Sequence, residues 1–345
     1  LKLFYNRSIA MKRIGKRTIV FENNPCITGY GSVVGKKEHE GPLSNEFDAY
    51  TTDSFFGEKS FEKAESKLQK TALSYALNRA GVEPKDVDNI FAGDLLNQCI
   101  GSSFGLREFG IPFIGLYGAC STMALSSGLA AIFVDSGAAK RAAAVTSSHF
   151  CSAERQYRYP LNYGSQRTQT AQWTVTGSGA LILEKAEKGI CISSVTFGEI
   201  EDFKIKDANN MGAAMAPAAA STLLHYFEDS NSSPEDYDII YTGDLGYVGT
   251  NLFYQLLERE GVDIKCRHSD CGLIIFDRDS QDVHSGGSGC GCSASVLSSF
   301  IMHRFEKNDF SNILFMSTGA LMSPTSSFQG ESIPGIAHLL NIKKV

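Results

Sequence analysis

The residue best suited to chemistry in this sequence is Cys120, which begins a long apolar stretch. Small and apolar residues follow it at almost every position, so we predict a helix buried on all sides, with Cys120 and Ser121 in its first turn. The unpaired N–H groups and the dipole of a helix start favour a thiolate, as a nucleophile requires. The same N–H groups could instead receive a ligand carboxylate. A third interpretation is a small buried cysteine that only packs the helix start.

Acyl transfer by such a thiol needs a proton acceptor from elsewhere in the chain. Two histidines are candidates: His268, which precedes Ser-Asp-Cys-Gly, and His284, which precedes a Gly-rich loop containing Cys290. Histidines in loops more often contact solvent or backbone. His149 follows a predicted strand at 142–147, whose carboxyl end should face the site. It would then bond either a ligand or only a neighbouring backbone group.

An anion could bind at a second group of residues. Arg155 and Arg158 alternate with Tyr157 and Tyr159 in the run from Glu154 to Pro160. Guanidinium groups match carboxylates in a bidentate manner, and tyrosines can flank an aromatic ring. The alternative is a loop whose arginines pair with acids such as Glu154.

The elements that must position these residues repeat within the chain. The run 84–95 returns at 234–245 with a constant offset of 150 residues, and both copies end in Gly-Asp-Leu. Cys120-Ser121 returns as Cys292-Ser293 with an offset of 172 residues, again before an apolar stretch. Each half reads as helix, strand, turn, buried helix and strand, an alternation typical of parallel strands with crossover helices.

We therefore predict an α/β fold of two duplicated halves related by a pseudo-twofold axis. A helix that is buried on all faces must lie between two sheets, which gives a layered α/β/α/β/α arrangement. The expected division is an N-terminal extension (1–10), a first half (11–188) and a second half (189–345). Asp94 and Asp244 are equivalent under the repeat and would repel a dianion unless paired. We predict that they accept N–H groups in turns that frame the pocket.

Composition excludes several functions. The net charge is −6 without any block of Lys and Arg, which argues against nucleic-acid binding. Nine cysteines lie mostly in apolar strings, as expected in a reducing compartment, and none has zinc-ligand spacing. We expect neither a metal nor a cofactor. No apolar run reaches the ~20 residues of a membrane helix, and the first ten residues do not resemble a signal peptide.

Several strings, taken in order, resemble the thiolase and ketoacyl synthase superfamily: Gly118-Ala-Cys-Ser121 with its apolar helix, and Thr176-Gly-Ser-Gly-Ala180 with the strand that follows. Within that superfamily, the chain is most similar to the stage V sporulation protein AD family. The strings that carry this resemblance are Ala92-Gly-Asp-Leu-Leu-Asn-Gln98, Ala153-Glu-Arg-Gln-Tyr-Arg-Tyr-Pro160, Met215-Ala-Pro-Ala-Ala219, Asp270-Cys-Gly272 and Gly286-Gly-Ser-Gly-Cys290.

This resemblance implies a sporulation protein that binds dipicolinic acid (pyridine-2,6-dicarboxylic acid) for its uptake into or release from spores. It implies a location in the forespore, peripheral to the inner membrane, with membrane-embedded partners from the same operon. A homodimer is expected because superfamily members usually pair through the edge of the first-half sheet. The candidate ligand-binding residues are Cys120, Ser121, His149, Arg155, Arg158, Asp94 and Asp244.

Catalysis is the point on which the sequence departs from its superfamily. Ketoacyl synthases carry a histidine in the loop after the first strand of the second half, where this chain has Asp244. A carboxylate beside a thiol raises the thiol pKa and opposes nucleophilic attack. We therefore expect a binding protein without catalysis. The alternatives are an acyltransferase that uses Cys120 with His268 or His284, and an interaction scaffold with a vestigial pocket.

Overall fold

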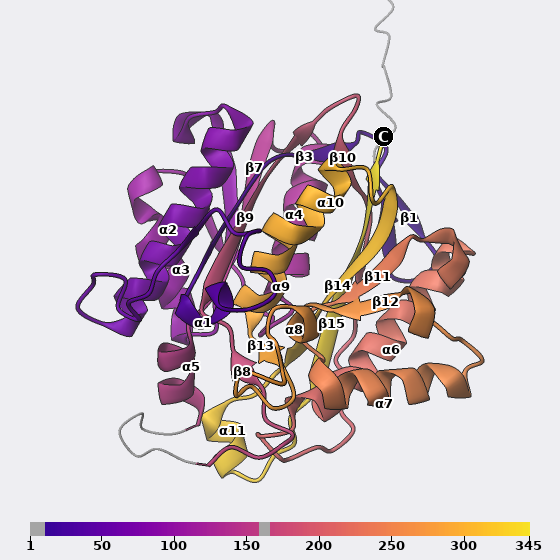
Figure 1. Cartoon of the computed structure of the whole chain (residues 1–345). Coiled ribbons are helices and arrows are strands. Elements are labelled where there is room, and N and C mark those ends of the chain that lie inside the picture. The colour runs from indigo at the N-terminus through magenta and orange to yellow at the C-terminus, as the bar shows by residue number, and fades with distance from the viewer. Residues whose placement is uncertain (1–10, 159–165) are drawn as a thin grey trace, which may run out of the picture.

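The computed structural model describes residues 11–158 and 166–345 (Figure 1). The expected extension 1–10 and Tyr159 lie outside these residues. A 13-stranded sheet runs through the molecule. Its main path is β12 (His268–Asp270), β11 (Ile239–Thr242), β14 (Asn312–Ala320), β15 (Gly335–Lys344), β10 (Ile190–Phe197), β3 (Pro25–Val34), β9 (Gly177–Lys185), β7 (Arg141–Ser148), β5 (Asn89–Gly93) and β6 (Phe113–Gly115).

The strand order is the same when it is followed inward from either edge. β6, β5, β7, β9 and β3 of the first half correspond to β12, β11, β14, β15 and β10 of the second. β5 in the first half and β11 in the second each have a parallel neighbour on both sides. The next strand inward, β9 or β15, runs antiparallel to its neighbour β7 or β14. This mirrored order confirms the predicted duplication. The expected boundary at 188/189 falls between β9 and β10, and it stays a prediction as a division into domains.

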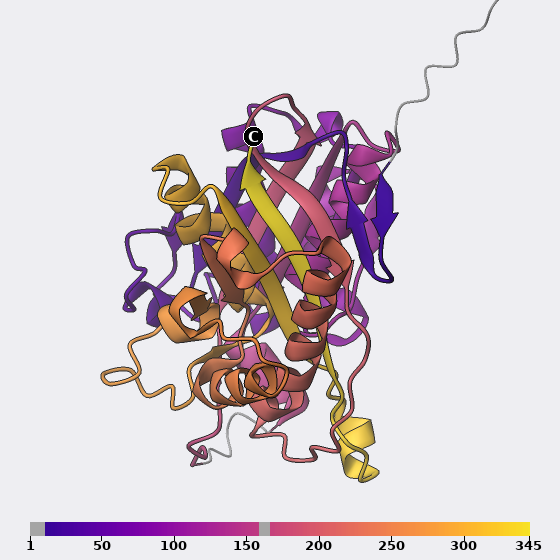
Figure 2. The ribbon, with the colours of Figure 1, turned by 90° about the vertical axis from the view of Figure 1, so that its right-hand side faces the viewer.

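Helices form three further layers (Figures 1 and 2). One outer layer contains α2 (Phe61–Ala80) and α3 (Ile100–Leu106), and the other contains α6 (Met211–Ser230) and α7 (Gly246–Arg259). Between the two halves of the sheet lie α4 (Thr122–Asp135) and α9 (Cys290–Val296), which continues through a π-helical turn into α10 (Met302–Glu306). Every residue of α9 is buried, as are most residues of α4. The predicted layered α/β arrangement is confirmed.

The sequence repeat has a local structural cause. Pro84–Asp86 and Pro234–Asp236 each form a 3₁₀ turn closed by a capping box, which begins the strand that follows. Asp88 accepts the backbone N–H groups of Lys140 and Arg141, and Asp238 accepts those of Ser311 and Asn312. The repeated aspartates therefore join the same two neighbouring strands in each half.

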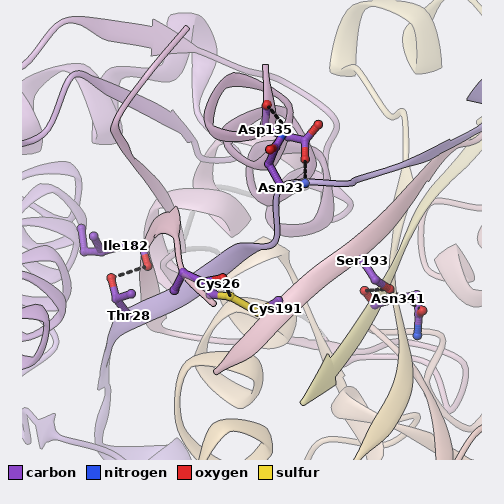
Figure 3. Close-up of a disulfide and its surroundings, with 9 residues drawn as sticks. Asn23, Cys26, Thr28, Asp135, Ile182, Cys191, Ser193 and Asn341 are labelled. Carbon is purple, nitrogen blue, oxygen red and sulfur yellow. Dashed lines mark hydrogen bonds between the residues drawn. A yellow bond between two sulfur atoms is a disulfide. The ribbon is translucent and has the colours of Figure 1, made fainter. Parts of the chain in front are cut away.

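The two halves of the sheet meet along a narrow seam between β3 and β10. Only one residue pair there is in register, Cys26 with Cys191, and these two cysteines form a buried disulfide (Figure 3). The remaining seven cysteines are free. The expectation that the cysteines would be reduced is wrong for this pair, because two strands 165 residues apart in sequence bring the sulfur atoms together.

Loss of this disulfide should lower stability because its cross-link restrains a loop of 165 residues in the unfolded chain. The double variant Cys26→Ala/Cys191→Ala should lose about 2–4 kcal/mol in free energy of unfolding, measured by denaturant titration without reductant. Cys266→Ala, which removes an exposed free cysteine, is the matched control and should change little. In denaturant, a thiol-specific reagent should find seven thiols before reduction and nine after it. Nine thiols before reduction would contradict the disulfide.

Candidate functional site

Cys120 lies in a tight turn between β6 and α4, at the centre of the molecule. The preceding residue, Ala119, has a left-handed backbone conformation with φ of 49°. Gly319, near the end of β14, approaches this turn so closely that a Cβ atom on it would lie 2.6 Å from the carbonyl oxygen of Gly118. The second half of the chain thus packs directly on the cysteine turn, and only glycine permits that approach.

The N–H groups that follow Cys120 are already used within the turn. Ser121 N–H donates to the Gly118 carbonyl at 3.0 Å, and Thr122 N–H donates to the Ala119 carbonyl at 3.3 Å. The Ser121 hydroxyl also donates to Gly118, at 2.6 Å. The interpretation that these N–H groups receive a ligand carboxylate is therefore not supported, and Ser121 serves the turn itself.

Asp244, from the second half, lies beside the Cys120 thiol. Its carboxylate also accepts the Gly289 N–H at 2.9 Å and the Thr318 hydroxyl at 2.8 Å. Burial raises the pKa of Asp244 to about 7. Burial and then the Asp244 carboxylate raise the pKa of the Cys120 thiol well above its ordinary value. The thiol is therefore a neutral hydrogen-bond donor, as expected for a cysteine beside an aspartate.

A second cysteine, Cys290 of α9, belongs to the same small cluster. It packs with Cys120, Leu95 and Ala153, against which Tyr157 also lies. Its thiol donates to the Ser147 carbonyl at 2.9 Å, and burial raises its pKa well above the ordinary value. Neither thiol in this cluster is prepared for nucleophilic attack.

A cavity opens on the Cys120 side of this cluster. About 390 Å³ of space lies between its walls when the open solvent at the mouth is counted, and the wall is mostly apolar. Among the described residues that line it, Arg158 is the single cation, and two tyrosines bring phenol groups to it. The lining residues are Leu95, Tyr117, Ala119, Cys120, Ala153, Tyr157, Arg158, Thr174, Met211, Ser288, Ala320 and Met322.

Arg158 is held in place by a buried acid. Its Nη1 pairs with Glu154 one turn earlier on α5 (Phe150–Tyr157), and the side chains of both residues are about one-tenth exposed. Nη2 contacts only the Met211 sulfur, at 3.6 Å, and the buried Nε has no hydrogen-bond partner among the described residues. Nε and Nη2 form one edge of the guanidinium, the edge that binds a carboxylate with two parallel bonds. That edge is left unsatisfied beside the cavity.

Two other candidates lie outside the cavity. Arg155 is half exposed, pairs with Glu62 and stacks over Phe61. His149 is buried at the start of α5, where Nδ1 accepts the Cys151 N–H and Nε2 donates to the Ser54 carbonyl at 2.8 Å. Burial lowers the pKa of His149 to about 4, so the ring is neutral. Of the two alternatives for His149, the structure has the bond to backbone.

The histidines considered as general bases are also elsewhere. His268, on edge strand β12, bonds the hydroxyls of Thr242 and Tyr254, and burial lowers its pKa to about 3. His284 contacts Asp282 and the Thr168 carbonyl. Neither lines the Cys120 cavity. Among the described residues, the titratable group beside the Cys120 thiol is therefore the acid Asp244 and not a histidine.

The equivalent aspartates have diverged. Asp94 accepts the N–H groups of Leu96 and Ser102 at 2.8 Å, as predicted for a turn aspartate. It lies beside buried Glu65, whose pKa rises to about 8 through burial and the Asp94 charge. Glu65 in turn binds the hydroxyls of Ser147 and Ser152. Asp94 thus supports the first half internally, whereas Asp244 reaches Cys120.

The sequence indicated some of the cavity wall but missed much of it. No distinguishing motif marks Tyr117 or Met211, which lie next to predicted elements, and Met322 lies in a turn. Ser288 lies within the string Gly286-Gly-Ser-Gly-Cys290, which carries part of the family resemblance, and Thr174 lies two residues before another such string, Thr176-Gly-Ser-Gly-Ala180. Within residues 11–158 and 166–345, no group of three or more His, Cys, Asp or Glu side chains is arranged to hold a metal.

The Asp244 charge can be tested through the reactivity of Cys120. Asp244→Asn should increase the rate of Cys120 alkylation by iodoacetamide by about tenfold at a fixed alkaline pH, because one pKa unit changes the thiolate population tenfold. Mass spectrometry of the Cys120 peptide over time gives the rate. Asp94→Asn, in the equivalent position of the first half, should leave this rate unchanged. Equal rates in wild type and Asp244→Asn would mean that Asp244 does not control the thiol.

Comparisons with known proteins agree with this fold. Solved structures with the same fold include 3-oxoacyl-[acyl-carrier-protein] synthase III from Aquifex aeolicus, with a TM-score of 0.57 and 11% identity over 92% of this chain and 99% of that one. An OleA variant from Xanthomonas campestris has a TM-score of 0.58 and 12% identity over 94% of this chain and 99% of its own. At such low identity, these similarities establish the thiolase-like fold alone.

Sequence comparison is more specific. The family model of stage V sporulation protein AD (SpoVAD) matches residues 15–343. Stage V sporulation protein AD of Bacillus subtilis (strain 168) is 44% identical over 328 residues, which cover 95% of this chain and 97% of that protein. Among the described residues, no helix has both the length and the apolar character of a membrane span. The chain belongs to the stage V sporulation protein AD family, a sporulation family with a thiolase-like fold.

Proposed function

We propose that this protein binds dipicolinic acid in the cavity beside Cys120 and does not catalyse acyl transfer. The observation that carries the proposal is the unsatisfied Nε–Nη2 edge of Arg158. A buried guanidinium edge without an acceptor costs free energy, which a ligand carboxylate would recover. The pairing with Glu154 fixes the orientation of the guanidinium in advance, so less entropy is lost on binding.

The remaining wall suits a flat aromatic ring. Tyr117 and Tyr157 lie at the cavity with their hydroxyls 3.2 Å apart, and Tyr157 donates to the Leu95 carbonyl. The Tyr117 hydroxyl can therefore donate either to Tyr157 or to a ligand. We propose that one carboxylate of the ligand meets Arg158 and that the second lies toward Tyr117, at the mouth. The Cys120 end, where the thiol lies beside Asp244, would face the ring and not a carboxylate.

The proposal extends to the cellular setting that the family resemblance implies. It places the protein in the forespore, peripheral to the inner membrane, where it takes part in uptake or release of dipicolinic acid with membrane-embedded partners. A homodimer through the β6 edge is part of the same proposal. Its support is that β6 ends the sheet and that Phe113 and nearby Tyr117 are 40% and 47% exposed.

Isothermal titration with dipicolinic acid tests the site. Arg158→Lys keeps the charge opposite Glu154 but loses the bidentate edge. We expect it to weaken binding by about 1.5–3 kcal/mol, or roughly 10- to 150-fold. Arg155→Lys, on the outer face of α5, is the matched control and should bind like wild type. A Cys120→Trp variant, which fills the cavity, should not bind. Equal affinities in the two arginine variants would remove the site from the cavity, and no binding by wild type would leave the scaffold interpretation.

Acyl transfer is the second candidate function, favoured by the fold and by the position of Cys120. After incubation with acetyl-coenzyme A, intact-mass spectrometry should show no acetyl adduct on Cys120, because burial and Asp244 keep the thiol protonated. Asp244→His, which restores the residue type of ketoacyl synthases, is the informative comparison. A stable adduct in wild type that disappears in Cys120→Ala would establish the enzyme.

A further inference from the structure

Asp244 is a buried carboxyl that is held by uncharged donors. It follows β11 at the centre of the molecule and is 1% exposed. Its carboxylate accepts the Gly289 N–H at 2.9 Å and the Thr318 hydroxyl at 2.8 Å, and the Ser288 hydroxyl lies 3.4 Å from it. A buried carboxylate without a cation beside it keeps its charge at a cost in desolvation, and a proton removes that cost.

The titratable groups around Asp244 do not offset its charge. Asp270, at the end of β12, is a second buried carboxyl and opposes the ionisation of Asp244. Burial, and to a smaller extent Asp270, raises the pKa of Asp244 to about 7. The other titratable groups that face it are thiols, which burial keeps neutral by raising their pKa values: Cys120, Cys271, Cys290 and Cys292.

The cavity beside Cys120 brings no net positive charge to this carboxyl. Cys120 and Ser288 line the cavity, and Asp244 lies directly behind them. Arg158 of the lining already pairs with Glu154, so the charges of these two side chains cancel. A dicarboxylate in the cavity adds two negative charges within a mostly apolar wall. Like charges repel more strongly there than in water, and protonation of Asp244 removes part of that repulsion.

We infer that Asp244 takes up a proton when the cavity binds a dicarboxylate. This inference rests on the dipicolinic acid site proposed above and adds a coupling to it. The proton comes from solvent and goes to a carboxylate oxygen of Asp244. In mildly acidic solution Asp244 already holds this proton, so the ligand meets a neutral carboxyl. In alkaline solution binding has to bring the proton in, and affinity therefore falls as pH rises.

Calorimetric titration with dipicolinic acid, in buffers of different ionisation enthalpy, counts the protons taken up by the full-length protein. The ligand carboxyls are ionised from about pH 6 to 8, so uptake reports on the protein. If the ligand raises the pKa of Asp244 from about 7 to about 8, we expect about 0.4 proton per ligand at pH 8, less than about 0.1 at pH 6 and roughly fivefold weaker binding at pH 8. Binding without uptake at pH 8 would overturn the coupling but leave the site. No binding at either pH would overturn both.

Variants locate the proton. Asp244→Asn should bind without uptake, and its affinities at the two pH values should agree within about twofold. Asp94→Asn, at the equivalent position of the first half, is the matched control and should take up protons as wild type does. Loss of uptake in Asp94→Asn alone would place the proton on the buried pair of Glu65 and Asp94 and contradict the assignment.

Thermal unfolding checks that each variant is folded. If Asp244→Asn is not, Thr318→Val decides. Its lost hydroxyl no longer donates to the Asp244 carboxylate, so the uptake should move to higher pH. An unchanged pH dependence of uptake in Thr318→Val would contradict the assignment to Asp244.

Discussion

Two helices, α4 and α9, lie between the two halves of the sheet. Because α9 is wholly buried and α4 is mostly buried, their side chains must be small or apolar. Cys120 lies two residues before the first residue of α4, whereas Cys292 is the third residue of α9. The same packing brings Gly319 of the second half against the turn of the first. The cavity exists where this packing stops, at the end of the molecule where the loops of both halves converge.

Duplication explains the fold that the two halves share, and divergence of equivalent residues explains the site. Asp88 and Asp238 still make equivalent bonds between neighbouring strands. Asp94 and Asp244, which follow them by the same spacing, now do different things. The first accepts N–H groups in its own turn, and the second reaches across the centre to a thiol in the other half. The Asp244 carboxyl thus holds the Cys120 thiol neutral.

Much of the fold could be predicted because it depends on local patterns. Constant-offset repeats, capping turns and an all-apolar helix each limit the topology independently, and the mirrored strand order follows from them. The site was harder to predict from the sequence. Arg155 and Arg158 look alike in sequence and are only three residues apart. In the structure Arg155 points outward to Glu62, whereas Arg158 points inward to Glu154. Met211, the first residue of α6, and Met322, in a loop, line the cavity although no sequence periodicity marks them. The Cys26–Cys191 disulfide depends on a contact between strands distant in sequence, so spacing could not reveal it.

The buried carboxyls near the centre link folding to proton uptake. Burial raises the pKa values of Glu38 and Asp244 to about 7, of Glu65 to about 8 and of Asp270 to about 6. In the unfolded chain these groups titrate near pH 4. The folded protein therefore holds protons that the unfolded chain has released, and the contribution of these carboxyls to stability falls as pH rises from about 4 to 8. The buried histidines have the opposite effect, at lower pH. His149, His268 and His338 have depressed pKa values, so they favour unfolding once pH falls below about 6.5. The two sets of groups therefore oppose each other between about pH 4 and 6.5, and above about pH 6.5 the carboxyls alone act, so alkaline surroundings weaken this fold.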